Sequence, residues 1–465
     1  MSFKSIIILS FCVIFSAPAW GIVFVEWSDA VLPAPNSLGV NQIVVAWEGG
    51  SATELLMTAH KQGYRVYVET PPKQAASAAK ACAKTHCAGI FLSVPESESA
   101  DAAKSIANLH SAYPKLPVRV LSLAGKPPKM RGSFVIKRNS VLEVSSPTAQ
   151  PWVDTNLSLI RVEQRSRRPH IPFYAFSWSD QPDKPILTAD DYSLAVAEAG
   201  AFHADLVLQL EEHLQQALNA RDADAWTLWN QVRSMLIFSA DAGTQALESV
   251  ANVAVIMDRL DPGDEVLNLL SRHNIPFRVF TTADLKATDL KAFDVVIVFL
   301  KPDAESAERI ENLATAGATV VVVDAHGKYS WQTSQPVQLN EHTTSYAAGN
   351  GKVLEMAEPV SDPETFAQDI RRLLGKQNSL LSLWNGLTTI AVPYKGRAGI
   401  ANVELVNYAG EPVRLQVQVR GSFTSVRYET PEHGCCEYLV PVKHDGFTEF
   451  VIPDLRVAGR IHLEP

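Results

Sequence analysis

The sequence is poor in the residues that mark several protein classes. Its 465 residues include only 5 cysteines, 24 glycines and 28 prolines, and the glycines and prolines are scattered, which excludes a collagen-like or low-complexity protein. Long Lys/Arg runs are missing and the formal net charge is −9, so neither nucleic acid nor an anionic membrane is the expected partner. Hydrophobic residues make up 46% and charged residues 20%, as in soluble globular proteins. At about 150 residues per domain, the chain has room for two to four domains.

Long hydrophobic runs are also missing, apart from one at the N-terminus. Lys4 precedes an apolar run from Ile6 to Phe15, and Ala17-Pro-Ala19 supplies a small-x-small cleavage pattern, so residues 1–19 are predicted to be a cleaved signal peptide. An uncleaved anchor is the alternative, but the run is only about half as long as a bilayer span requires. We therefore expect a periplasmic or secreted protein without a membrane span after cleavage.

The four cysteines outside this leader form two pairs that are close in sequence. Cys82 and Cys87 lie around the end of an expected helix, where a local disulfide fits, and zinc bound by Cys82, His86 and Cys87 is the alternative. A structural zinc site needs four protein ligands and only three candidates lie here. A structural role is therefore favoured for Cys82 and Cys87, and no metal or cofactor is expected. Cys435 and Cys436 are adjacent. A vicinal disulfide, pairing elsewhere and a reduced state all remain open for them.

Residues 20–245 alternate short apolar runs with helical stretches. The runs are continuous and rich in Val, Ile, Leu and Phe, as expected of strands buried on both faces. Eight strand–helix units in about 220 residues predict a (β/α)₈ TIM-like barrel. An open doubly wound sheet is the alternative, but no glycine fingerprint follows the first strand. The expected strands are 22–27, 43–47, 65–69, 89–94, 118–123, 141–144, 173–178 and 205–210.

Two further domains are expected after the barrel. Residues 250–376 restart a βαβ pattern, which predicts a flavodoxin-like open α/β domain. Its strands are expected at 253–257, 277–280, 294–299 and 319–323, and its helices at 263–273, 304–316 and 364–374. Residues 385–465 lose helical periodicity and alternate apolar and polar positions between turn signals, which predicts a small all-β sandwich.

Barrel, open sheet and sandwich in this order resemble the retaining glycoside hydrolases with TIM barrels. The order is especially similar to a bacterial β-galactosidase family with a glutamine-amidotransferase-like trimerisation domain and a C-terminal sandwich. The segment Gly351-Lys-Val-Leu-Glu355 with the helix at 363–374 resembles the end of that middle domain. Val403-Glu-Leu-Val-Asn-Tyr408 resembles one of its sandwich strands. The resemblance implies a possible homo-oligomer through the middle domain. Because no cysteine lies between Cys87 and Cys435, this domain is not a thiol glutaminase.

A retaining glycosidase needs two carboxyl groups about 5–5.5 Å apart at the barrel mouth. The resemblance places the acid/base after the fourth strand, usually as Asn-Glu, and the nucleophile at the end of the seventh. Glu96 follows the fourth strand after Pro95, whereas the seventh ends near Asp180 and lacks a glutamate. Glu69 closes the third strand. We therefore predict Glu96 and Glu69 as the catalytic candidates. Glu26 ranks below them, with an internal ion pair as its alternative role.

The segment 145–156 is the most informative loop, because it is long and mixes an aromatic ring with amides and a carboxylate. Sugar sites combine such aromatic plates with polar side chains that bind hydroxyl groups. Core packing is the alternative for the tryptophans, and a helix-leading loop is the alternative for Glu48. The expected substrate-binding residues are Trp27, Glu48, Gln150, Trp152, Asp154, Asn156 and Trp178.

These features predict an exported glycoside hydrolase-like protein that acts on an oligosaccharide or polysaccharide. Two alternatives keep the fold without the reaction. One is a catalytically degenerate carbohydrate-binding protein. The other is a cell-envelope scaffold, for which an apolar surface patch is expected.

Overall fold

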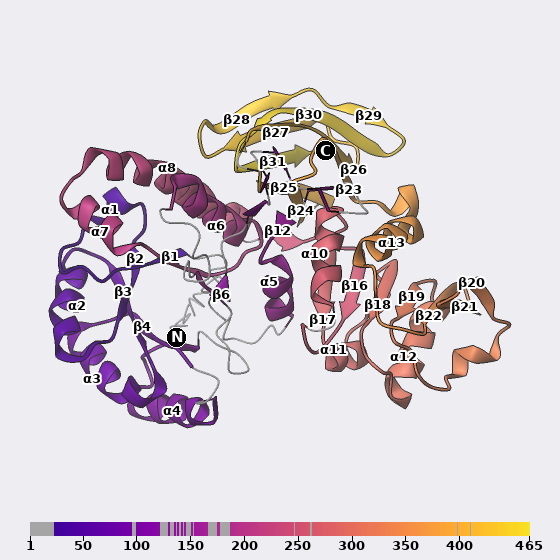
Figure 1. The fold of residues 1–465 in the computed structure, drawn as a ribbon, viewed down its shortest axis with the longest axis horizontal. Helices are drawn as coiled ribbons and strands as arrows, with labels where there is room; N and C mark the ends of the chain where they lie inside the picture. Colours follow the sequence, from indigo (N-terminus) through magenta and orange to yellow (C-terminus); the bar gives the residue numbers. More distant parts are fainter. Residues whose placement is uncertain are drawn as a thin grey trace, which may run out of the picture.

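The computed structural model describes residues 23–94, 99–120, 187–245, 247–260, 263–397, 399–409 and 411–465. Between 129 and 176 it describes 129–130, 134–135, 137–138, 141–142, 144–145, 150–151, 153–165 and 174–176. The predicted leader, residues 1–19, lies outside this part of the chain. The chain forms a barrel-like domain, an open α/β domain beside it, and a β-sandwich across the top of the view (Figure 1). Within the described residues, no helix combines the length and the apolar character needed to cross a bilayer.

The first domain is built on one eight-stranded parallel sheet. Its strands follow the order β5-β4-β3-β2-β1-β14-β13-β6, so the last strand in the sequence pairs with the first, as a barrel requires. The α/β barrel prediction is confirmed. The strands are β1 (Val23–Glu26), β2 (Gln42–Ala46), β3 (Arg65–Thr70), β4 (Gly89–Leu92), β5 (Val118–Val120), β6 (Lys129–Met130), β13 (Tyr174–Phe176) and β14 (Leu206–Gln209).

The sixth barrel strand differs from the prediction. It is β6, which pairs in parallel with β13, whereas the apolar stretch predicted at 141–144 forms β9 (Val141–Leu142) and part of β10 (Val144–Ser145). These two strands pair antiparallel with β8 (Lys137–Arg138) and β11 (Gln150–Pro151). Lys129–Met130 carries no apolar run, so hydrophobic periodicity misses it.

Helices cover the outside of the sheet, where alternate strand residues face them. A capping box between Thr188 and Asp191 fixes the start of α6, because each side chain binds a backbone N–H of the other residue. The main helices are α2 (Ala52–Lys61), α3 (Ala75–Thr85), α4 (Ser99–Ala112), α5 (Leu157–Gln164), α6 (Ala189–Ala201), α7 (Glu212–Asn219) and α8 (Ala223–Ser239).

The second domain contains a seven-stranded sheet of order β17-β16-β18-β19-β22-β21-β20. The first five strands are parallel and β21 and β20 are antiparallel, which is a flavodoxin-like order with an added hairpin. Its strands are β16 (Val253–Ile256), β17 (Phe277–Phe280), β18 (Val295–Val298), β19 (Thr319–Val322), β20 (Val337–Asn340), β21 (Thr343–Ala348) and β22 (Gly351–Met356). Its helices are α10 (Asp264–Arg272), α11 (Thr282–Ala287), α12 (Ala304–Thr315) and α13 (Pro363–Asn378).

The third domain is an antiparallel sandwich of a six-stranded and a four-stranded sheet, and β15 (Glu248–Ser249) adds to the edge of the larger one. A separate apolar core lies within it, formed by residues such as Val403, Val417 and Ile461. The larger sheet contains β24 (Thr389–Gly396), β25 (Gly399–Asn407), β31 (Ala458–Glu464), β27 (Ser425–Thr430) and β28 (Gly434–Leu439). The smaller contains β23 (Leu381–Trp384), β26 (Val413–Arg420), β30 (Phe447–Leu455) and β29 (Val442–His444).

Buried polar contacts join the three domains. Glu198 of α6 is fully buried and accepts hydrogen bonds from the backbone and side-chain nitrogens of Asn156 at 2.9 and 2.8 Å. It also accepts one from the Tyr408 hydroxyl at 3.0 Å, which ties barrel and sandwich together. Thr155, just before α5, donates to Asn268 of α10 at 3.2 Å. The segment around α5 is therefore the link between barrel and middle domain.

Candidate functional site

The interior of the barrel is filled by an aromatic layer. Phe24, Tyr67 and Phe91 come from β1, β3 and β4 and form a cluster separate from the main core. Their ring centroids lie 5.0–5.2 Å apart, with Tyr67 stacked on Phe91 and Phe24 edge-on to both. Because side chains alternate along a strand, residues two positions further along face the same interior. These positions form the next layer, toward the carboxyl ends of the strands.

That layer is polar and contains two carboxyl groups. Glu26 lies two residues after Phe24 in β1, and Glu69 lies two residues after Tyr67 in β3. Gln209, at the end of β14 and in register with Glu26, donates from Nε2 to Glu26 Oε2 at 2.7 Å. The Ser93 hydroxyl, directly after β4, donates to Glu69 Oε1. All four side chains therefore gather at the end of the barrel where TIM-barrel enzymes carry their active sites.

The protonation of the two carboxyls differs because their surroundings differ. Burial, and then the negative charge of Glu69, raise the pKa of Glu26 to about 7, although the hydrogen bond from Gln209 opposes the rise. Burial also raises the pKa of Glu69, and the hydrogen bond from Ser93 opposes that rise. A buried pair of this kind retains a proton near neutral pH. Of the two, Glu26 is the one whose pKa is raised to about 7, so it is the better suited to hold a proton.

An ion pair lies toward the opposite end of the barrel. Asp205, at the N-terminal end of β14, is almost fully buried, and its Oδ2 lies 3.5 Å from a guanidinium nitrogen of Arg119 in β5. Arg65 donates to the hydroxyl of Tyr67 at 3.3 Å. The aromatic layer therefore separates this ion pair from the polar layer that contains Glu26 and Glu69.

Of the predicted catalytic residues, the structure places Glu69 at this mouth, while Glu96 lies outside the described residues. Among the predicted substrate-binding residues, Trp152 and Trp178 also lie outside them. Gln150 and Asp154 are described by their backbone alone, as members of β11 and of β12 (Val153–Asp154).

The remaining predicted binding residues are not brought together. Trp27 is fully buried in the main core on the helix-facing side of β1, and its indole donates to the Val31 carbonyl at 2.9 Å. Asn156 is buried against Glu198 at the domain junction. Glu48 is exposed at the start of the loop after β2. Within the described residues, these three therefore do not line one cleft.

Sequence reasoning did not name Gln209 or Ser93, and it ranked Glu26 below Glu69 without pairing the two. For Gln209 a signal was present, because it lies two residues beyond Val207, which faces the interior. Ser93 carries no such signal, since a serine after a strand is common.

The two cysteine pairs differ in the structure. Cys82 and Cys87 are reduced thiols, with Cys82 buried and Cys87 half-buried beside the Thr85 hydroxyl at 3.2 Å. Cys435 and Cys436 form a vicinal disulfide. At the mouth, the described residues contain no cluster of three His, Cys, Asp or Glu ligands within reach of one ion.

No protein-family profile and no curated protein sequence matches this chain. Among solved structures, the α-L-fucosidase isoenzyme 2 from Paenibacillus thiaminolyticus is similar at a TM-score of 0.60 and 13% identity, with 95% of this chain and 99% of the fucosidase covered. The cold-adapted β-galactosidase from Rahnella sp. R3 is similar at a TM-score of 0.58 and 11% identity, with 94% and 99% covered. At these identities the likeness concerns the fold. The chain has the multi-domain TIM-barrel architecture seen in glycoside hydrolases.

Proposed function

We propose that the protein is an exported glycoside hydrolase that acts on an oligosaccharide at the carboxyl end of the barrel. The observation that carries this proposal is the convergence of Glu26 and Glu69 in one buried layer at the mouth. Glycoside hydrolysis uses two carboxyl groups of opposite protonation state, and the pair supplies them. The multi-domain architecture shared with the fucosidase and the β-galactosidase supports the same assignment of substrate class.

The surroundings of each carboxyl suggest its role. Glu26 keeps its proton to about pH 7 because it is buried beside Glu69, so it suits the general acid that protonates the leaving oxygen. Glu69 accepts a hydrogen bond from Ser93, which stabilises its charged form, so it suits the nucleophile or base. Glu96 follows the same strand end as Ser93 and remains a predicted partner.

The test is a hydrolysis screen of the mature chain against a panel of oligosaccharides and aryl glycosides. Glu26→Gln and Glu69→Gln are expected to lower kcat by about 10²–10⁴-fold, the usual contribution of a positioned acid or base. Glu54→Gln, an exposed carboxylate on α2, is the matched control and is expected to retain wild-type turnover. Glu96→Gln distinguishes a pair formed with Glu96 from the pair Glu26–Glu69.

Unchanged turnover in both Glu26→Gln and Glu69→Gln contradicts the assignment of the pair. Sugar binding without turnover on any substrate would instead support a degenerate carbohydrate-binding barrel. Export is tested separately by N-terminal sequencing of the protein recovered from the periplasm or medium. A mature chain that begins near residue 20 is the expected result.

An assembly role is a second candidate, and the middle domain favours it. β20 is the edge strand of its sheet, and all four of its residues are exposed, including Val337 and Leu339. An exposed apolar edge strand is a typical site of pairing with another chain. We expect wild type to sediment as an oligomer, and Val337→Lys with Leu339→Lys to shift it toward the monomer. A wild-type monomer at high concentration contradicts this role.

A further inference from the structure

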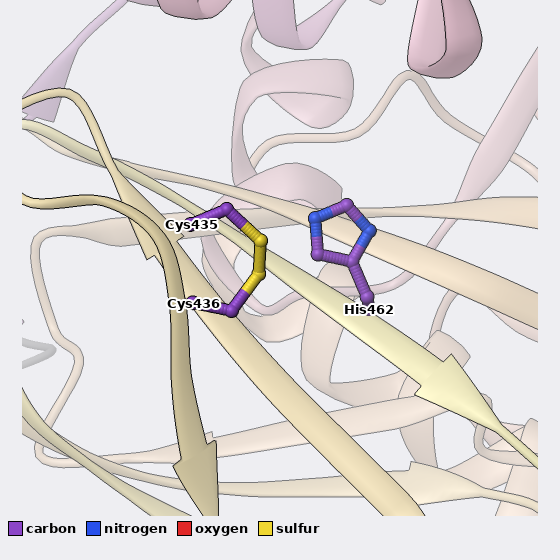
Figure 2. A group of neighbouring side chains, drawn as sticks. All are labelled: Cys435, Cys436 and His462. Carbon is purple, nitrogen blue, oxygen red and sulfur yellow. A yellow bond between two sulfur atoms is a disulfide. The ribbon is translucent and has the colours of Figure 1, made fainter.

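A bulge in the sandwich brings two sulfur atoms to one place. In the pairing of β27 with β28, Glu429 is opposite Cys435 and Tyr428 is opposite Glu437, so Cys436 is the extra residue of a β-bulge. On its other side, β27 pairs with β31, which carries His462. The ligand atoms of Cys435, Cys436 and His462 all lie within 4.8 Å of one another, and the imidazole faces the two sulfurs (Figure 2).

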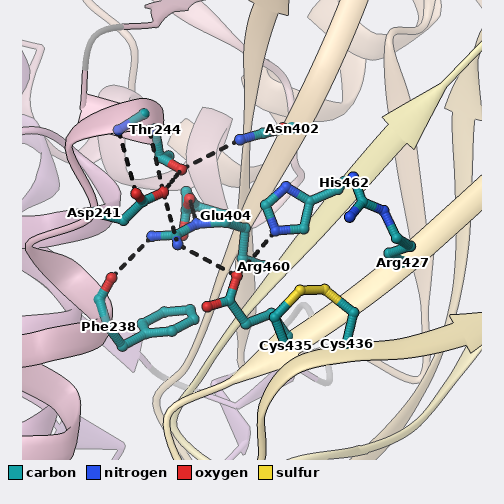
Figure 3. Close-up of polar contacts among 12 residues, drawn as sticks. Phe238, Asp241, Thr244, Asn402, Glu404, Arg427, Cys435, Cys436, Arg460 and His462 are labelled. Atoms are coloured by element: carbon teal, nitrogen blue, oxygen red, sulfur yellow. Dashed lines mark hydrogen bonds and ion pairs between the residues drawn. A yellow bond between two sulfur atoms is a disulfide. The ribbon is translucent and has the colours of Figure 1, made fainter.

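A network of polar contacts holds the histidine in place. His462 Nε2 lies 2.9 Å from Glu429 Oε2, and Glu429 in turn lies 3.6 Å from Arg460 Nη1. Arg460 is only 2% exposed, and it binds Glu404 at 2.5 Å and the Phe238 carbonyl at 3.1 Å (Figure 3). The carboxylate beside the imidazole is thus fixed from the protein interior. Glu429 binds Nε2, the ring nitrogen that lies nearer the two sulfurs in Figure 2, so an ion bound by this nitrogen would displace the hydrogen bond.

We propose that the reduced form of Cys435 and Cys436 binds Zn²⁺ together with His462, and that the vicinal disulfide is the metal-free form of this site. Two thiolates and one imidazole are a known zinc ligand set that leaves a fourth position open. Cys435 is exposed, which gives the ion an entry path. In the metal-free form Glu429, itself held by Arg460, binds His462 through Nε2.

Oxidation state controls the site because thiolates are the ligands. A dithiol or phosphine reductant supplies two electrons that break the S–S bond, and two protons then complete the two thiols. A dithiol is itself oxidised to a disulfide and supplies the two protons, whereas a phosphine is oxidised to its oxide by taking the oxygen of one water molecule, which supplies the two protons. Zn²⁺ binding releases those two protons as the thiolates coordinate. In the disulfide form the sulfurs are bonded to each other, so the oxidised chain lacks two of the three ligands.

The test uses the full chain reduced under anaerobic conditions, with the reductant removed before titration. Zn²⁺ is titrated in competition with a chromophoric chelator, and Co²⁺ is used as a spectroscopic probe. We expect one tightly bound equivalent, with thiolate-to-cobalt charge-transfer bands in the Co²⁺ form. The oxidised chain, which has the same sequence, is expected to bind at least 100-fold more weakly.

Variants separate this site from the other thiols. Cys435→Ser with Cys436→Ser is expected to abolish the charge-transfer bands, and His462→Gln is expected to weaken binding by about 10–100-fold. Cys87→Ser, which removes a thiol of the distant reduced pair, is the matched control and is expected to bind as wild type. Three results would overturn the proposal: no metal uptake by the reduced chain, uptake retained in the double serine variant, or unchanged affinity in His462→Gln.

Discussion

Glu26 and Glu69 extend from strands β1 and β3 into the same end of the barrel, where burial and then the Glu69 charge raise the pKa of Glu26 to about 7. The aromatic layer beneath them, formed by Phe24, Tyr67 and Phe91, keeps the bottom of the site apolar. An apolar layer of this kind favours the neutral form of a carboxyl group next to it. This relationship makes the protonation of Glu26 measurable without a known substrate.

The first prediction concerns stability and pH. The pKa of Glu26 is 4.5 in an unperturbed chain and about 7 in the folded protein, so between these values the folded state holds more protons and stability falls as pH rises. Glu26→Gln cannot ionise. We therefore expect Glu26→Gln to gain stability over wild type between pH 4.5 and 7, by up to about 3 kcal/mol. Denaturation curves across this range measure the gap. Glu54→Gln should show no gain in stability over wild type. A difference in stability between Glu26→Gln and wild type that does not change with pH contradicts the prediction.

The second prediction concerns the coupling of the two carboxyls. Glu69→Gln removes the negative charge that helps to raise the pKa of Glu26. The midpoint of the Glu26-dependent stability change should then move to lower pH, while staying above 4.5 because burial remains the larger cause. The comparison of Glu69→Gln with Glu26→Gln/Glu69→Gln isolates this midpoint. A midpoint that stays in place or rises shows that the two groups are not coupled.

The third prediction concerns the domain junction. Glu198→Ala leaves two nitrogens of Asn156 and the Tyr408 hydroxyl without their buried acceptor. Each unsatisfied buried group costs about 1–3 kcal/mol, so we expect a loss of about 3 kcal/mol or more in urea unfolding. Tyr408→Phe removes one donor alone and should cost about 1 kcal/mol. Equal losses in the two variants contradict the role of Glu198 as the shared acceptor.

The fourth prediction concerns Gly351 at the start of β22. A Cβ at this position would overlap the backbone carbonyl oxygens of Ala314 and Ala318, and backbone atoms cannot rotate away as side chains do. Gly351→Ala should therefore destabilise the middle domain by about 1–3 kcal/mol. Gly50→Ala has no atom within 4 Å of the added carbon and should change stability by less than about 0.5 kcal/mol. Thermal unfolding of the two variants is the measurement, and equal midpoints would refute the steric argument.

Continuous apolar runs made most of the fold predictable. Val295–Val298 and Thr319–Val322 fall within one residue of their expected ranges, because strands buried on both faces need largely unbroken apolar sequence. The same rule failed at the sixth barrel strand. Lys129–Met130 pairs in the sheet without any apolar signal, while the apolar stretch from Val141 forms hairpins.

The site was predictable only in part. The position of Glu69 at the mouth was predictable because it lies at the end of a clear strand. That Glu26 lies in the same layer depends on how the sheet curls, which no local pattern records. Trp27 illustrates a rule that was available. It follows Glu26 directly, so the two side chains point to opposite faces of β1, and only one of them can lie in the barrel interior. In the structure, Glu26 lies in the barrel interior and Trp27 is buried in the core between the sheet and the helices.

The β15–β24 pairing has a consequence for how the molecule is assembled. Ser249 pairs with Tyr394 in the larger sheet of the sandwich, so the chain joins the third domain before it enters the second. The two ends of the middle domain also meet, because the Asn252 side chain donates to the Asn378 carbonyl at 2.6 Å. The chain thus leaves the sandwich and returns to it at one place, and the middle domain is inserted there. A short bridge from 252 to 378 would therefore replace this domain and keep barrel and sandwich joined in one chain.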